Sequence, residues 1–344
     1  MGDILKGYYS FTAHPFDPAL DPKTAFDFKA RGVSLLKELD VFRFTDLKSC
    51  FLEVGPFQVA SETLRGHLAG RAYDPVTGDP PMILIQGAPG TGLDSMAKYA
   101  AYLVRESAPG SDLKLDSVGV GTDSQAKFLM LLVQTIESYM KDVPGAAKVF
   151  NKYEKLLDPK APDLGYLQPL LSELKGPAAA APGIILTIGP ITYDRRDWIS
   201  WLYKLLNPLN VLPILLTDDP RVAAKFDGLV GGDIQGVAIR LSGFTSAEGR
   251  EFAKRRLEYF RGNPVDPGLF PYEESAVTKM FAELPEGRLG VKLFIRVLRG
   301  SLNRKVIKLA PTFKEPPPPA TETQITWDDV LDSYKAFIGP MAQG

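Results

Sequence analysis

The chain contains very little cysteine and histidine. Cys50 is the one cysteine among 344 residues, and His14 and His67 are the two histidines. A lone thiol cannot close an intramolecular disulfide, and these three side chains cannot supply the four N/S ligands of a zinc site. The shortage also leaves little material for Ser-His or Cys-His catalysis. We therefore expect no metal site and no catalytic triad.

Long apolar runs and a strong net charge are also missing. The longest apolar stretches, near 82–85, 184–188 and 211–216, are far shorter than the roughly 18 residues that cross a bilayer. The first residues, Met-Gly-Asp-Ile-Leu-Lys, lack the apolar run of a signal peptide. The net charge of −1 argues against coating nucleic acid by bulk electrostatics. We expect a cytoplasmic protein that does not bind membranes.

The charges are distributed unevenly. Residues 250–308 hold thirteen Lys and Arg against seven Asp and Glu, so this region carries +6 and the rest of the chain carries −7. A basic module on an acidic body can contact an anionic partner. A solvated surface rich in Lys and Arg is the alternative explanation.

A glycine-rich turn follows the first strongly apolar run. After Met-Ile-Leu-Ile-Gln at 82–86 come Gly87, Ala88, Pro89, Gly90, Thr91, Gly92, Leu93, Asp94 and Ser95. The spacing of Gly87 and Gly92 matches the phosphate-binding pattern G-x-x-x-x-G-K-[ST] in frame. Backbone N–H groups of such a loop, at a helix N-terminus, attract anions. These nine residues are the candidate nucleotide-binding segment.

The two side chains that would act on a bound nucleotide are absent from this loop. Leu93 occupies the place of the lysine, and Asp94 occupies the place of the metal-binding hydroxyl, with Ser95 one position late. Lys98 lies about one and a half helical turns beyond Gly92, too far to replace that lysine. A purely structural role is an open alternative, because a tight strand-to-helix turn needs glycines whatever it binds.

Strands and helices alternate along the middle of the chain. Apolar runs predict strands at 82–86, 113–120, 184–188, 212–216 and 237–241, and helical periods predict helices at 57–68, 95–105, 124–140 and 198–206. Continuous apolar strands are typical of a parallel sheet covered by helices on both faces, so the fold class is α/β. The segment 175–183, Lys-Gly-Pro-Ala-Ala-Ala-Ala-Pro-Gly, is expected to be a surface connection.

The pattern after residue 243 is helical only. Thr245-Ser-Ala-Glu248 is a capping box, and a later helix has an apolar stripe beside a basic one. The apolar stripe contains Leu289, Leu293, Phe294, Val297 and Leu298, and the basic stripe contains Arg288, Lys292, Arg296 and Arg299. A polyproline segment at 315–319 precedes an amphipathic helix that begins near Thr326. That helix either folds back on its own chain or docks a partner on a tether.

We divide the chain into four segments. They are an N-terminal extension (1–60), a P-loop NTPase-like α/β core (61–243), a helical lid (244–310), and a Pro-rich linker with a C-terminal amphipathic helix (311–344).

The glycine loop and this order of elements resemble the AAA+ and related STAND-type P-loop ATPases over about residues 60–305. The branch that the chain resembles most comprises the origin-recognition, transposition and secretion ATPases, whose core is followed by a helical lid. The resemblance implies ATP or ADP as the ligand. It also implies a magnesium-binding Asp and a water-activating Glu after the third strand, a polar residue after the next strand, an arginine acting in trans, and a basic lid residue facing the nucleotide.

Several of these features have no counterpart in the sequence. Gly189-Pro190 follows the third strand, and the nearest acid is Asp194. Thr217-Asp218-Asp219-Pro220 fits the polar position after the next strand, and it is also an ordinary strand-ending turn. Gly231-Gly232 stands where the arginine acting in trans is expected.

The functional hypotheses follow from these departures. Phosphoryl transfer depends on positioning and charge neutralisation. Removing one such electrostatic contributor raises the activation free energy by on the order of 2.7–4 kcal/mol. Our leading hypothesis is a catalytically degenerate AAA+-like regulatory or scaffolding subunit, with no catalytic residues and a protein partner. The alternatives are a non-hydrolysing ATP/ADP-binding switch and a nucleic-acid-associated subunit, although no recognition motif supports the latter. The cofactor is therefore none or ATP/ADP, and homo-oligomerisation is left open.

Overall fold

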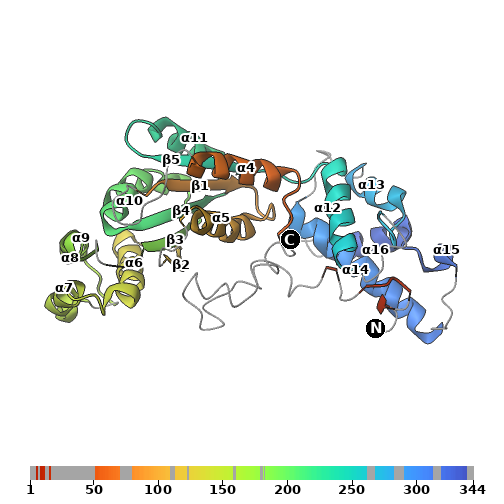
Figure 1. The fold of residues 1–344 in the computed structure, drawn as a ribbon, viewed down its shortest axis with the longest axis horizontal. Helices are drawn as coiled ribbons and strands as arrows, with labels where there is room; N and C mark the ends of the chain where they lie inside the picture. The colour runs from red at the N-terminus through yellow and green to blue at the C-terminus, as the bar shows by residue number, and fades with distance from the viewer. Residues whose placement is uncertain are drawn as a thin grey trace.

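The structure is a computed structural model of the chain. It describes residues 5–6, 8–11, 15–16, 51–69, 80–108, 113–121, 124–157, 160–178, 181, 183–261, 268–282, 290–312 and 319–338. Figure 1 shows an α/β lobe beside a lobe made of helices. Arg288, Leu289 and the polyproline segment up to Pro318 lie outside the described residues, as do His14 and Cys50.

Five parallel strands form one sheet in the order β2-β3-β4-β1-β5. Their bounds are β1 (Met82–Gly87), β2 (Leu113–Gly119), β3 (Gly183–Gly189), β4 (Val211–Thr217) and β5 (Gly236–Leu241). Ile83 of β1 lies opposite Ile214 of β4 on one side and Val237 of β5 on the other. The predicted α/β class with a parallel sheet is confirmed, and the glycine loop leaves the sheet between two neighbouring strands at their carboxyl ends.

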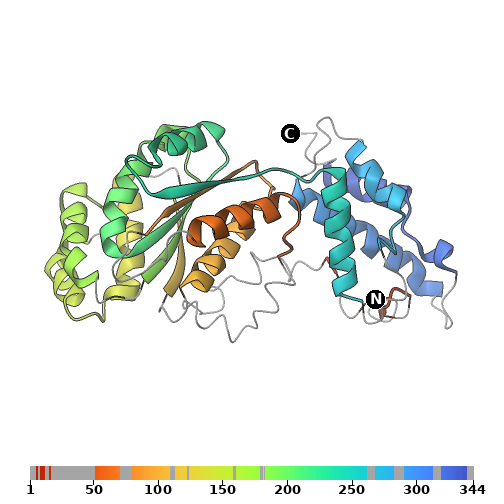
Figure 2. The ribbon, with the colours of Figure 1, turned by 45° about the horizontal axis from the view of Figure 1, so that its top comes forward.

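Helices cover both faces of the sheet, as Figure 2 shows. One face carries α4 (Pro56–Ala69) and α5 (Leu93–Ser107). The other carries α6 (Gln125–Met140), α10 (Trp198–Leu206) and α11 (Pro220–Leu229). Within the described residues, no helix is long and apolar enough to cross a membrane.

Three further helices lie between α6 and β3. They are α7 (Ala146–Tyr153), α8 (Leu164–Glu173) and α9 (Lys175–Ala178). The sequence predicted none of them and assigned 175–183 to a surface connection, which is wrong at its start because α9 forms there and Ala178 is buried. Pro169 within α8 and Gly-Pro within α9 usually interrupt helices. Here the burial of three leucines, Leu167, Leu170 and Leu171, stabilises α8 in spite of its proline.

The helical lobe contains α12 (Ser246–Tyr259), α13 (Glu274–Ala282), α14 (Val291–Leu309), α15 (Ala320–Thr323) and α16 (Trp327–Ile338). The capping box at the start of α12 is present, with the Thr245 N–H donating to Oε2 of Glu248 at 2.7 Å. The C-terminal helix α16 packs on α14 and α13. It therefore folds back on its own chain, the first of the two alternatives.

N-terminal residues pack against the helical lobe. The Tyr9 hydroxyl donates to the carbonyl of Thr323 at 2.8 Å, and Nε of Arg256 donates to the carbonyl of Pro15 at 2.8 Å. One hydrophobic cluster extends from these residues through α4 and α5 into α12, α13 and α14. The boundaries of the four predicted domains remain a prediction.

Candidate functional site at the glycine loop

The glycine loop forms a closed turn between β1 and α5. Gly90 and Gly92 have φ values of +87° and +96°, which disfavour a residue with a side chain. The hydroxyl and the N–H of Thr91 both donate to the carbonyl of Ala88, at 2.8 and 3.1 Å. At Gly87 a Cβ would lie 2.5 Å from Oγ1 of Thr91, so the turn closes tightly on the end of β1.

The positions of the lysine and the hydroxyl carry side chains of other kinds. Leu93 is half-buried and packs against the hydrophobic cluster that joins the two lobes. Asp94 is exposed in the first turn of α5, and Ser95 is half-buried. The negative charge of Asp94 lies at the end of the helix that would otherwise favour an anion. The loop therefore combines the glycines of the phosphate-binding pattern with a carboxylate that would oppose an anion.

The lid contacts this loop directly. The backbone N–H of Lys292, in the first turn of α14, donates to the carbonyl of Gly90 at 3.0 Å. The carbonyl oxygen of Gly90 is also 3.7 Å from the position that a Cβ on Gly290 would take. Of the three predicted basic residues that the structure describes on the lid, Lys292 is the one beside the glycine loop. Arg296 and Arg299 lie one and two turns further along α14.

Position 189, at the end of β3, has no room for a carboxylate. A Cβ on Gly189 would lie 2.7 Å from Cβ and 3.0 Å from the carbonyl oxygen of Leu216 in β4. Beyond Gly189-Pro190, the N–H of Ile191 donates to that same carbonyl at 2.7 Å. The chain leaves β3 pressed against the neighbouring strand, so a side chain at position 189 would displace backbone.

The polar residues after β4 hold the backbone together. The Thr217 hydroxyl is fully buried and donates to the carbonyl of Ile191 at 2.7 Å. Asp219 caps α11, accepting from the N–H of Arg221 at 2.9 Å and from its Nε at 3.0 Å. Hydrogen bonds from Arg221 lower the pKa of Asp219. Thr217 and Asp219 thus make an ordinary strand-to-helix turn.

Asp194, the acid nearest in sequence to the end of β3, lies in the short helix η4 (Tyr193–Arg195). Its side chain is 75% exposed and 3.8 Å from Nε of Arg195. A hydrogen bond from Thr192 lowers its pKa. Among the described residues, no three His, Cys, Asp or Glu side chains gather as they would around a metal ion.

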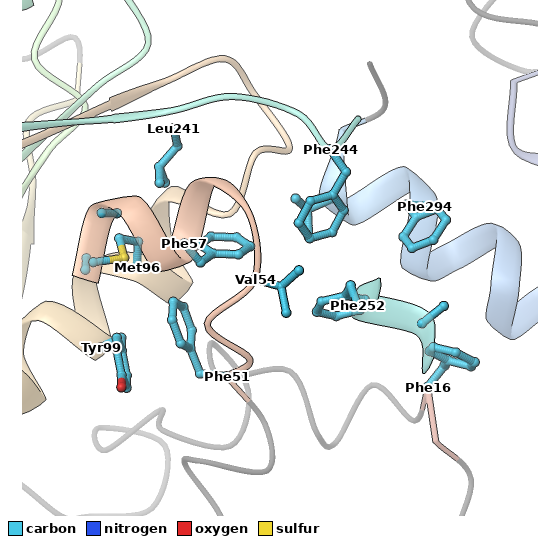
Figure 3. Packing of buried hydrophobic residues seen from close by; sticks show 14 of the residues in the cluster. Phe16, Phe51, Val54, Phe57, Met96, Tyr99, Leu241, Phe244, Phe252 and Phe294 are labelled. Carbon is cyan, nitrogen blue, oxygen red and sulfur yellow. The ribbon is translucent and has the colours of Figure 1, made fainter. Parts of the chain in front are cut away.

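Aromatic side chains fill the seam between the glycine loop and the lid. A Cβ on Gly92 would lie 2.8 Å from Cζ of Phe57, so that ring rests on the loop. Phe57 meets Phe244 edge to face at 6.0 Å, and Phe244 meets Phe294 of α14 at 5.9 Å. Figure 3 shows these rings continuing into Phe252, with Val54 between the two lobes. Sequence reasoning missed this row, because its members come from separate elements.

The segment before α4 is anchored by a polar cluster. Glu53 accepts from the Tyr99 hydroxyl at 2.5 Å and from Nη1 of Arg65 at 3.0 Å, while Phe51 stacks on Tyr99 at 4.1 Å. Burial and the hydrogen bond to Glu53 raise the pKa of Tyr99. Burial alone would raise the pKa of Glu53, but the hydrogen bonds from Arg65 and Tyr99 lower it. This cluster fixes the segment that carries Val54 and Phe57 to the core.

Solved structures with this architecture are known, although neither models of protein families nor curated proteins match the sequence. The Aeropyrum pernix ORC2 protein in its ADPNP-ADP complexes has a TM-score of 0.51 and 12% identity, over 80% of this chain and 66% of that one. Its ADP form has a TM-score of 0.50 and 14% identity, over 80% of this chain and 67% of that one. This chain has the AAA+ fold. A third AAA+ structure, the Aeropyrum pernix ORC1 protein in complex with DNA, has a TM-score of 0.49 and 14% identity, over 82% of this chain and 64% of that one.

The likeness to the two ORC2 structures establishes the AAA+ fold, and this chain spans about two thirds of their length. The predicted AAA+-like core with a helical lid is confirmed at the level of fold. Binding of nucleotide by Gly87, Ala88, Pro89, Gly90, Thr91, Gly92, Leu93, Asp94 and Ser95 remains a prediction.

Proposed function

We propose that the chain is a catalytically degenerate AAA+-like protein that acts as a regulatory or scaffolding subunit through contacts with other proteins. The observation that carries the proposal is the end of β3, where Leu216 leaves no room for a side chain at Gly189. An AAA+ ATPase needs carboxylates there, and the loop also lacks its lysine. A cytoplasmic location and a protein partner belong to the same proposal.

Release of phosphate from ATP tests this function. The full chain is incubated with ATP and magnesium, and its rate is compared with that of Gly92→Asp, which places a side chain against Phe57. We expect the two rates to be equal and at background. Steady turnover that Gly92→Asp abolishes would contradict the proposal.

A second candidate is a switch that binds ATP or ADP without hydrolysing it. The bond of 3.0 Å between the Lys292 N–H and the Gly90 carbonyl favours it, because this bond joins the glycine loop to the start of the lid. The ORC2 structures named above are complexes with ADPNP and ADP. A ligand that binds only the folded state raises the melting temperature. A melting temperature unchanged by millimolar ATP or ADP, with or without magnesium, would rule this switch out.

A further inference from the structure

The exposed face of α14 carries cations that have no carboxylate partner in the described part of the chain. Lys292 and Arg296 are exposed, Arg299 and Asn303 are half-buried, and Ile307 is 60% exposed. These five residues are three or four positions apart, so they form one stripe along the helix. We call it the α14 stripe, and it is about 22 Å long.

The opposite side of the same helix is different. Lys308 donates to Oδ1 of Asp329 at 2.7 Å, and Lys305 lies 3.7 Å from Oδ2 of the same carboxylate. Lys292, Arg296 and Arg299 form no salt bridge with any residue that the structure describes. The two lysines that face α16 thus share a carboxylate inside the chain, whereas the three cations on the stripe have none among the described residues.

We propose that the α14 stripe is a docking surface for an acidic segment of a partner protein, with an apolar residue that packs on Ile307. The proposal rests on the proposed scaffolding function, since it names the surface and the chemistry of the partner. Carboxylates of the partner would lie over Lys292, Arg296 and Arg299. Docking there would also affect the glycine loop, because the Lys292 N–H donates to the carbonyl of Gly90.

Three features favour an acidic protein over nucleic acid. The stripe ends in an exposed isoleucine, which gains nothing from a phosphate backbone, and it contains no aromatic ring on which a base could stack. Three cations along about 10 Å of helix also match a short acidic segment better than a long polyanion.

A designed peptide provides the probe. It is a fluorescein-labelled, Ala-rich helix with three Glu residues spaced as the three cations are, and a Leu placed eight residues beyond the last Glu. Binding to the full-length chain is measured by fluorescence anisotropy at low salt. We expect K292E/R296E/R299E to weaken binding by about tenfold or more, because three attractive charges become repulsive. The matched variant K141E/K254E/K279E changes the net charge equally at three exposed lysines elsewhere, and we expect it to stay within about twofold of wild type.

The apolar end is tested by a double-mutant cycle. We expect Ile307→Ser to weaken binding of the Leu peptide about threefold and to have no effect on a peptide with Ser in place of Leu. The single variant R296E changes one exposed residue and keeps the test valid if the triple variant does not fold.

Three results would overturn the proposal. The first is that the Glu peptide binds no more tightly than a peptide with Gln in place of Glu. The second is that the matched variant loses as much affinity for the Glu peptide as K292E/R296E/R299E does. The third is that a dT20 oligonucleotide binds more tightly than the Glu peptide, with a steep salt dependence. Hydrolysis of ATP would contradict the proposed function while leaving the docking result standing, so the two failures are distinguishable.

Discussion

At the scale of single residues, Gly92 and Gly189 limit what the ends of two strands can carry. Gly92 begins α5 with a φ of +96° and lies under the ring of Phe57. Gly189 ends β3 against the backbone of Leu216. The glycine pattern of the loop was predictable because it is local in sequence. The closure at Gly189 was not, because Leu216 comes from another strand.

Gly92→Ala should lower the free energy of unfolding by about 2 kcal/mol. The left-handed conformation costs a residue with a Cβ roughly 1–2 kcal/mol, and the Phe57 ring must also move. Gly66→Ala is the matched control, because Gly66 lies within α4 and a Cβ there meets nothing within 4 Å. Since alanine favours helix, we expect that control to be neutral or stabilising by up to about 1 kcal/mol. If urea denaturation gave the same change in the free energy of unfolding for Gly92→Ala and Gly66→Ala, the steric explanation would be refuted.

Gly189→Asp should destabilise the chain by about 1–3 kcal/mol, because the new side chain overpacks against Leu216. Gly119→Asp is its counterpart at the end of the neighbouring strand β2, where a Cβ meets nothing within 4 Å. We expect that variant to stay within about 0.5 kcal/mol of wild type. Thermal and urea unfolding of the pair measure the difference, and a stable Gly189→Asp protein would show that the end of β3 can accept a carboxylate.

At the scale of elements, the C-terminal helix shows how a short amphipathic segment is held. The carboxylate of Asp329 in α16 is 7% exposed and accepts from Lys308, while Lys305 lies nearby. The pattern of apolar residues predicted the helix itself. Its packing on α14 depends on residues about twenty positions earlier in the chain. The sequence therefore did not decide whether the helix folds back on its own chain or docks a partner on a tether. Helices α8 and α9 were missed because burial overrides the local effect of their proline and glycine, and α7, which contains neither, was missed as well.

Asp329→Asn should lower the free energy of unfolding at pH 7 by about 2 kcal/mol, because it removes a buried, charge-assisted hydrogen bond. Burial alone would raise the pKa of Asp329, but hydrogen bonds from Lys308 and the Thr326 N–H, with the charge of Lys305, lower it. The folded pKa is thus below the unfolded one, so this stabilisation is complete above about pH 4 and is lost as pH falls further. The difference between wild type and Asp329→Asn should therefore shrink under acid, whereas Asp332→Asn, at an exposed position, should change little at either pH.

At the scale of the whole molecule, the aromatic seam makes the two lobes one packed unit. Phe244 is fully buried and contacts Phe57 from the core side and Phe252 and Phe294 from the lid side. The sequence predicted a core followed by a lid. It could not predict how they meet, because the seam is assembled from α4, α12, α14 and the segment after β5.

Phe244→Ala should lower stability by about 3–5 kcal/mol and uncouple the lobes. Trp198 and Trp201 report on the core and Trp327 on the helical lobe. Trp→Phe substitutions leave either the two core tryptophans or Trp327 as the sole fluorophore. With Phe244 in place, we expect both fluorescence signals to report the same urea unfolding transition. In Phe244→Ala we expect two transitions at different urea concentrations. Tyr259→Ala, at a side chain that is 53% exposed, should leave a single transition in place. Separate transitions in the parent chain would mean that the seam does not couple the lobes.

The most direct test of the central claim restores the loop alone. The variant L93K/D94S places a lysine and a hydroxyl in register with the phosphate-binding pattern while Gly189 and Leu216 stay as they are. Its release of phosphate from ATP is measured beside that of wild type and Gly92→Asp. We expect the same background rate for all three proteins, because the end of β3 still supplies no carboxylate. Steady hydrolysis by L93K/D94S would contradict it, since the loop would then be the only part of the site that had been lost.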